Sequence, residues 1–348
     1  MPAISILFFI TSLILGTAMT LSSNHWFMAW MGLEISTLAI IPLMTMHHHP
    51  RAIEAATKYF ITQAAAAAII LFASLINALM TSQWDIYFDL RPFPAALLIL
   101  ALALKLGIAP VHVWFPEVLQ GLNLTTGLIL ATWQKLAPFI LLLQIMPSSP
   151  LLMILLGLMS ILVGGWGGIN QTQLRKVLAY SSIAHVGWII LVIQLNQTLS
   201  LLALMLYIPM TMTVFLMLMY NSTHSYNSLA ISWSKSSMIL VMAPFAFLSL
   251  AGLPPLSGFL PKWLIMEELT KQDIPMIALV AAISSLLSLY FYIHLLYTLS
   301  VMMAPNLAHG GMAWRLYPLK SPLPIAIAFV LSTLAIPFSP LIYSLLPI

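Results

Sequence analysis

The stretch that decides the fold is Leu97-Leu98-Ile99-Leu100-Ala101-Leu102-Ala103-Leu104-Lys105-Leu106-Gly107-Ile108-Ala109-Pro110-Val111-His112-Val113-Trp114-Phe115-Pro116-Glu117. Its first half is apolar enough for a transmembrane helix, but Pro110 has no N–H to donate and its ring clashes with the carbonyl four residues earlier. We therefore expect the helix to open near Leu106 and Gly107. Backbone groups freed inside a bilayer must face protein or a water-filled cavity. An ionisable side chain at that depth, here Lys105, is a candidate functional residue.

The composition of the whole chain agrees with a membrane protein. Of its 348 residues, 61% are hydrophobic and only 6% are charged, whereas a soluble domain carries about 25% charged residues. The chain has no cysteine, which excludes disulfides, thiolate-held iron–sulfur clusters and cysteine–zinc sites. The formal charge of +4 is spread over the loops, so we expect no nucleic-acid partner. The predicted class is an all-α polytopic membrane protein.

Apolar windows of about 20 residues, separated by short polar or proline-rich segments, predict eleven transmembrane spans. The N-terminal run lacks the basic segment of a signal peptide, so we expect it to be the first helix of the mature chain. The predicted spans are 3–22, 25–45, 53–80, 92–120, 123–146, 149–168, 174–194, 198–220, 236–270, 275–303 and 323–345.

The loop charges predict the orientation of these spans. With the N-terminus inside, the outside loops hold two basic residues, Arg91 and Lys271, together with three aspartates. The inside loops then hold six basic residues and no acid: Arg51, Arg175, Lys176, Lys235, Arg315 and Lys320. Because basic loops favour the inside, we expect the N-terminus inside and the C-terminus outside.

Two predicted spans are too long for straight helices in a hydrocarbon core of about 30 Å, since 92–120 would extend roughly 43 Å and 236–270 roughly 50 Å. Both contain the spacing G-x2-P-x5-P, which begins at Gly107 and at Gly252. The two spans are five apart and so cross in opposite directions, a pattern typical of inverted repeats. We expect one repeat over 3–146, an inverted one over 149–303, and an additional C-terminal helix over 323–345.

Four ionisable residues fall deep within these spans: Glu34, Lys105, Lys135 and Lys262. Each costs about 2.5–3.5 kcal/mol to insert. One explanation is structural, with a Glu34–Lys105 ion pair joining two helices, but this leaves Lys135 and Lys262 unexplained. A lysine removed from water gives up its proton more easily, whereas a nearby carboxylate stabilises its protonated form. The set therefore predicts a proton relay through water, with Glu34 and Lys105 as its switch.

The histidines give weaker signals. His112 lies in the first break and His185 in the seventh span; either could relay protons through water, and a helix-packing role is equally compatible with the sequence. Three adjacent imidazoles at 47–49 could bind a metal, although a solvated loop end is the preferred interpretation. No two spans carry histidines spaced to clamp a haem. We predict neither a metal site nor a cofactor site in this chain.

Five stretches support a family resemblance: Trp30-Met31-Gly32-Leu33-Glu34, Leu104-Lys105-Leu106-Gly107-Ile108-Ala109-Pro110-Val111-His112, Trp133-Gln134-Lys135-Leu136-Ala137-Pro138, Tyr180-Ser181-Ser182-Ile183-Ala184-His185 and Gly252-Leu253-Pro254-Pro255-Leu256-Ser257-Gly258-Phe259. With these motifs the chain resembles, over nearly its whole length, the chain 2 family of mitochondrial NADH:ubiquinone oxidoreductase (complex I). That family belongs to the antiporter-like proton-channel subunits.

The resemblance implies an enzyme subunit that translocates protons but carries no redox centre. The complex passes electrons from NADH through FMN and iron–sulfur clusters, which are expected in other subunits, to ubiquinone. Glu34 and Lys105 match the family's Glu–Lys pair, Lys135 its central lysine and Lys262 its terminal lysine. Implied partners are the other membrane-arm subunits, including neighbouring antiporter-like and small membrane subunits, and the lipids of the inner mitochondrial membrane. The basic side of the predicted topology would be the matrix, so the C-terminus would lie on the intermembrane side.

Two alternatives remain open from the residues. The chain could be a subunit of a multi-subunit cation/proton antiporter without NADH chemistry, which co-purification with a flavin-containing, NADH-oxidising assembly would exclude. It could also be a non-pumping structural subunit of the membrane arm, in which the deep charges only join helices. In that case, neutralising each deep lysine would leave proton pumping unchanged.

Overall fold

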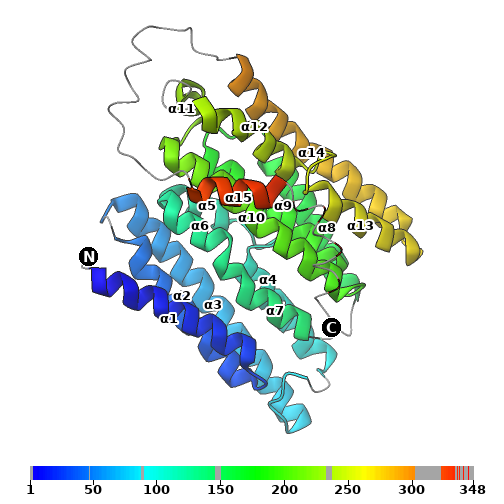
Figure 1. Ribbon diagram of the computed structural model, residues 1–348. Coiled ribbons are helices and arrows are strands. Elements are labelled where there is room, and N and C mark those ends of the chain that lie inside the picture. Colours follow the sequence, from blue (N-terminus) through cyan, green and yellow to red (C-terminus); the bar gives the residue numbers. More distant parts are fainter. Residues whose placement is uncertain are drawn as a thin grey trace. The chain divides into compact units, whose positions relative to one another are not determined.

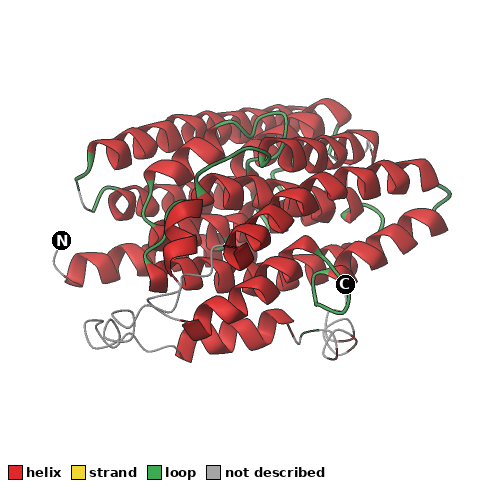
Figure 2. Ribbon diagram, turned by 90° about the horizontal axis from the view of Figure 1, so that it is seen from above, coloured by secondary structure: helices red, strands yellow, loops and turns green. Residues whose placement is uncertain are grey.

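The computed structural model describes residues 3–46, 48–87, 90–145, 150–232, 237–301 and 323–333, with the single residues 335, 337, 340 and 344 beyond them. The described residues form helices joined by loops, as Figures 1 and 2 show. His47 and the loop charges Asp89, Lys235, Arg315 and Lys320 lie outside them. So does most of 334–345, the second half of the last predicted span.

The chain forms two compact units, Met1–Ser160 and Ile161–Ile348. Helices of the first unit are α1 (Ala3–Ser22), α2 (Trp26–Met44), α3 (Pro50–Thr81), α4 (Pro92–Leu106), α5 (Trp114–Gly121), α6 (Leu124–Ala131), the 3-10 helix η1 (Trp133–Lys135) and α7 (Leu136–Gln144). Helix α8 (Pro150–Gly167) begins in the first unit and ends in the second. The second unit continues with α9 (Leu174–Val192), α10 (Gln197–Asn221), α11 (Tyr226–Ile231), α12 (Ser237–Ala251), α13 (Phe259–Lys271), α14 (Pro275–Val301) and α15 (Leu323–Thr333).

Seven helices in the described part of the chain are long and apolar enough to cross a membrane: Ile4–Ser22, Trp26–Met44, Pro50–Thr81, Leu124–Gln144 (with its interruption), Pro150–Gly167, Gln197–Asn221 and Pro275–Ser300. Three shorter helices, α4, α12 and α15, are also apolar. All-helical structure is what a bilayer requires, because a helix satisfies its own backbone hydrogen bonds. The helix bounds agree with most of the predicted spans to within a few residues.

Both predicted breaks are confirmed. Helix α4 ends at Leu106, and Gly107 follows in the left-handed region at φ 74°. Helix α12 ends at Ala251, and Gly252 follows at φ 79°. Glycine suits both positions because it has no Cβ to oppose a positive φ. Each break therefore begins in the same way, with a glycine at positive φ directly after the last helical residue.

The predicted span 123–146 corresponds to the apolar stretch Leu124–Gln144, but this stretch is interrupted. Helix α6 ends at Ala131, η1 intervenes, and α7 begins at Leu136. Pro138 gives the physical reason, because it cannot donate to the carbonyl of Gln134 and its ring crowds that carbonyl. A further short helix, α11, was not predicted; it begins with a capping box at Ser225.

Candidate functional site

Two of the predicted lysines line one cavity in the first unit. Its wall includes Lys105 at the end of α4, Lys135 at the end of η1, and Phe115 from α5. The cavity volume is about 10 Å³, close to the smallest space that holds one water molecule. Helices α2 and α3 close the cavity with Ser36, Thr37, Tyr59 and Gln63. The structure thus brings together two lysines that are 30 residues apart in the sequence.

Lys105 occupies the last turn of α4 and is only 6% exposed. A cation at this end of a helix is stabilised by the partial negative charge of the terminal carbonyls. Its Nζ is buried and has no hydrogen-bond partner in the described part of the chain. Oε2 of Glu34, on α2, is likewise buried and has no partner there.

The direct ion pair between Glu34 and Lys105, the structural alternative to a relay, is not formed among the described residues. Ion pairs closer than 4.0 Å among these residues join Lys58 to Glu54, Lys58 to Glu117 and Lys271 to Glu267. A direct Glu34–Lys105 ion pair therefore does not explain why these two residues lie within α2 and α4. Two buried polar atoms are left available to another hydrogen-bonding group.

Lys135 is buried to 3% exposure at the interruption between α6 and α7. Its Nζ lies 5.0 Å from the centroid of the Phe115 ring. The preceding residue, Gln134, donates from Nε2 to the backbone carbonyl of Ser36 at 3.0 Å. Gln134 thereby fixes the interruption to α2, the helix that carries Glu34. Sequence analysis did not select Phe115, which lies in the stretch that contains the first break, or Gln134, which lies inside a family motif.

Lys262 lies in the second unit, on α13. Its Nζ donates to the carbonyl of Ala251 at 2.8 Å, a carbonyl that the end of α12 leaves free. A Cβ on Gly252 would lie 2.9 Å from this Nζ, so the glycine also makes room for the lysine. The first unit uses an indole in a similar place, because Trp114 Nε1 donates to the carbonyl of Leu104 at 3.1 Å.

Neither candidate histidine lines the lysine cavity. His112 is half-buried in the first break, with Nδ1 3.2 Å from the carbonyl of Pro110, and it does not line the cavity. His185, in the second unit, packs its ring 5.7 Å from that of Tyr207. His49 caps α3 by accepting the N–H of Arg51. The described residues contain no group of three potential metal ligands.

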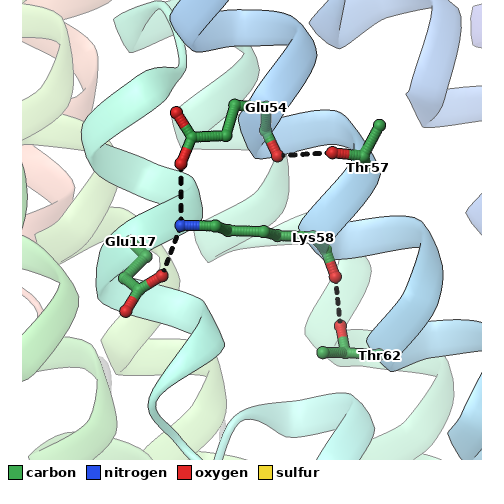
Figure 3. A network of polar contacts seen from close by, with 5 residues as sticks. All are labelled: Glu54, Thr57, Lys58, Thr62 and Glu117. Atoms are coloured by element: carbon green, nitrogen blue, oxygen red, sulfur yellow. Dashed lines mark hydrogen bonds and ion pairs between the residues drawn. The ribbon is translucent and has the colours of Figure 1, made fainter.

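A cluster of charges ties α5 to α3 (Figure 3). Lys58 Nζ lies 2.9 Å from Glu54 on its own helix and 2.8 Å from Glu117 on α5. The Glu54–Lys58 pair has the i,i+4 spacing at which opposite charges meet on one helix face. The pair with Glu117 had no sequence signal, because 59 residues separate the two positions.

Comparison with known proteins identifies the family. Residues 23–288 match the model "NADH:quinone oxidoreductase/Mrp antiporter, TM", and residues 289–343 match "NADH dehydrogenase subunit 2 C-terminus". NADH-ubiquinone oxidoreductase chain 2 from Gadus morhua is 61% identical over 335 residues, covering 96% of each chain. The protein of that name from Tetraodon nigroviridis is 57% identical over 333 residues, again covering 96% of each.

Solved structures agree with this assignment. A chain of respiratory complex I from Thermus thermophilus superposes with a TM-score of 0.88 at 27% identity, covering 98% of this chain and 79% of that one. A chain of the Mrp complex from Dietzia sp. shares the fold, with a TM-score of 0.80 at 16% identity and coverage of 96% and 75%. The chain therefore belongs to the NADH-ubiquinone oxidoreductase chain 2 family, as a multi-pass membrane subunit of complex I.

Proposed function

We propose that this chain translocates protons across the inner mitochondrial membrane, coupled to electron transfer from NADH to ubiquinone in other subunits. The relay runs through Glu34, Lys105, Lys135 and Lys262, with His112 and His185 as weaker candidates. FMN and the iron–sulfur clusters belong to other subunits, and this chain performs no redox step. Its contacts are with neighbouring membrane-arm subunits, antiporter-like and small ones among them, and with inner-membrane lipids.

The observation that carries the proposal is the cavity shared by Lys105 and Lys135. Both side chains are buried, and Lys105 Nζ has no hydrogen-bond partner in the described part of the chain. Buried ionisable groups are expensive in a membrane protein and commonly mark proton pathways. A water in the cavity would accept a proton from the Lys105 ammonium while passing one of its own to the Lys135 amine. The proton number is conserved and the charge moves from one lysine to the other.

Glu34 controls this step in the proposed cycle. A carboxylate that moves closer to Lys105 favours the protonated lysine, and one that moves away favours release of the proton. Quinone chemistry elsewhere in the complex would reset the charge state near Glu34. Lys262 then receives the proton for release on the acidic side.

The proposed architecture is two inverted five-helix repeats, 3–146 and 149–303, followed by one more helix, with eleven spans in total. It is supported by the paired breaks at Gly107 and Gly252, each with a positive φ. The excess of basic residues on alternate loops supports an N-terminus in the matrix and a C-terminus on the intermembrane side.

Substitution of Lys135 by methionine in the intact complex tests the relay. Methionine keeps most of the apolar stem but cannot carry a proton, so we expect Lys135→Met to reduce proton pumping, or the coupled NADH oxidation, severalfold. Lys271→Met is the matched control, because Lys271 is 63% exposed at the end of α13. Normal pumping together with normal turnover in Lys135→Met would remove Lys135 from the relay.

A non-pumping structural role is the competing function, and the same experiment addresses it. If Lys105→Met, Lys135→Met and Lys262→Met each left pumping at the level of Lys271→Met, the buried lysines would be packing elements only. A cation/proton antiporter is less well supported, because the similarity to the Mrp complex is one of fold, at 16% identity.

A further inference from the structure

Phe115 lies near the first break, at Gly107, and near Lys135, the buried lysine in the interruption between α6 and α7. The side chain is 1% exposed. The base of the side chain lies near Gly107, where an added Cβ would lie 3.2 Å from Phe115 Cβ and 3.4 Å from Cγ. The Lys135 ammonium lies over the ring, 5.0 Å from its centroid. The ring also forms part of the cavity wall between Lys105 and Lys135.

The face of an aromatic ring carries partial negative charge and attracts a cation, most strongly where water is excluded. Lys135, at 3% exposure, meets that condition. An ammonium held in this way loses rotamer freedom and is favoured in its protonated form. An aliphatic side chain of similar size would fill the space but supply no such attraction.

Three local contacts fix the position of the Phe115 ring. The backbone N–H of Phe115 donates to the carbonyl of His112 at 3.0 Å, and this hydrogen bond begins the turn into α5. The neighbouring Trp114 is anchored to the α4 carbonyl of Leu104 and packs edge-on against Phe115, with centroids 5.5 Å apart. Gly107 leaves the space that the Phe115 side chain needs. The break after α4 therefore places the Phe115 ring against Lys135, which lies between α6 and α7.

We propose that Phe115 is a positioning residue for proton transfer: its ring face holds the Lys135 ammonium at the wall of the cavity shared with Lys105. This inference rests on the proposed function, in which Lys135 carries a proton. It adds a residue that never exchanges a proton itself but determines where Lys135 lies and how readily Lys135 stays protonated.

The test compares Phe115→Leu, Phe115→Tyr and Phe215→Leu in the intact complex. Leucine removes the ring and keeps an apolar side chain, whereas tyrosine keeps the ring face. Phe215, on α10, is also 1% exposed, and no lysine lies over its ring among the described residues. Phe215→Leu therefore reports the cost of losing a buried ring without losing an ammonium contact.

The readout is proton pumping per NADH oxidised as a function of pH, at equal amounts of assembled complex. Without the ring, Lys135 loses its proton at lower pH, so the alkaline limb of the Phe115→Leu profile should move to lower pH by about 0.4 to 1.5 units. Phe115→Tyr should show a smaller shift, and Phe215→Leu should leave the limb in place.

Two outcomes would overturn the inference. One is a Phe115→Leu profile that matches that of Phe215→Leu; the other is an equal shift in Phe115→Leu and Phe115→Tyr. The single variant Lys135→Met, measured beside Phe115→Leu, separates this inference from the relay itself. If Lys135→Met abolishes pumping while Phe115→Leu leaves the profile unmoved, the relay stands and the role of Phe115 falls. If Lys135→Met pumps normally, the relay falls first.

Discussion

The two lysines beside the breaks meet different surroundings, although both were selected by the same signal. Lys105 precedes its break and its Nζ has no hydrogen-bond partner in the described part of the first unit. Lys262 follows its break and donates to the freed carbonyl of Ala251 at 2.8 Å. Lys262 therefore stabilises the end of α12 as well as serving as a candidate proton carrier. A single substitution of Lys262 would therefore remove both its hydrogen bond to α12 and its proton-carrying ammonium.

Two variants of Lys262 separate them. Lys262→Met leaves the Ala251 carbonyl without its donor, which costs about 1–3 kcal/mol when such a group is buried. Lys262→Gln retains an N–H donor but carries no exchangeable ammonium. We expect both variants to pump less, and only the methionine variant to lower the thermal unfolding midpoint of the complex clearly. If Lys262→Gln pumped normally, Lys262 would be a helix cap and not a relay member.

At the scale of elements, α5 has only eight residues, too few to form a stable helix alone in water. Tertiary contacts hold it in place. Trp114 and Phe115 are buried, and a Cβ on Gly121 would lie 2.7 Å from the carbonyl of Arg51 on α3, so the two helices approach closely there. The Lys58–Glu117 ion pair is the polar member of this set (Figure 3).

The carboxylates around Lys58 offer a matched pair of variants. Glu117→Gln removes the ion pair that joins α5 to α3, whereas Glu54→Gln removes only a pair within α3. Exposed ion pairs contribute little to stability, so amide hydrogen exchange over residues 107–121 should rise only about 1.5- to 5-fold in Glu117→Gln. Glu54→Gln should leave that segment unchanged, and equal exchange in the two variants would show that the ion pair does not hold α5.

At the scale of the whole molecule, the predicted orientation has a direct test because the natural chain contains no cysteine. His48 and Gln83 are both exposed and lie at opposite ends of α3. In mitoplasts, an impermeant maleimide should label Gln83→Cys at once. It should label His48→Cys only after the inner membrane is permeabilised. The reverse pattern would invert the proposed topology.

Much of the fold followed from local chemistry. Apolar length predicted most helices, and the proline spacing after Gly107 and Gly252 predicted where two of them break, because proline removes a donor and glycine permits a positive φ. The interruption before Pro138 also depends on a proline, but the run 123–146 has the length of a single span, so its length does not indicate a break. The second half of the last predicted helix, 334–345, lies mostly outside the described residues.

The sequence by itself determined the membrane class, the places where helices stop, and which ionisable residues are buried at a cost. Those properties depend on side-chain polarity and on backbone groups a few residues apart. Only the tertiary structure decided that Lys105 and Lys135 share a cavity, that Glu34 and Lys105 do not pair directly, and that Phe115 covers the Lys135 ammonium. These contacts join residues from different helices, and their distances depend on how those helices pack, which no local pattern specifies.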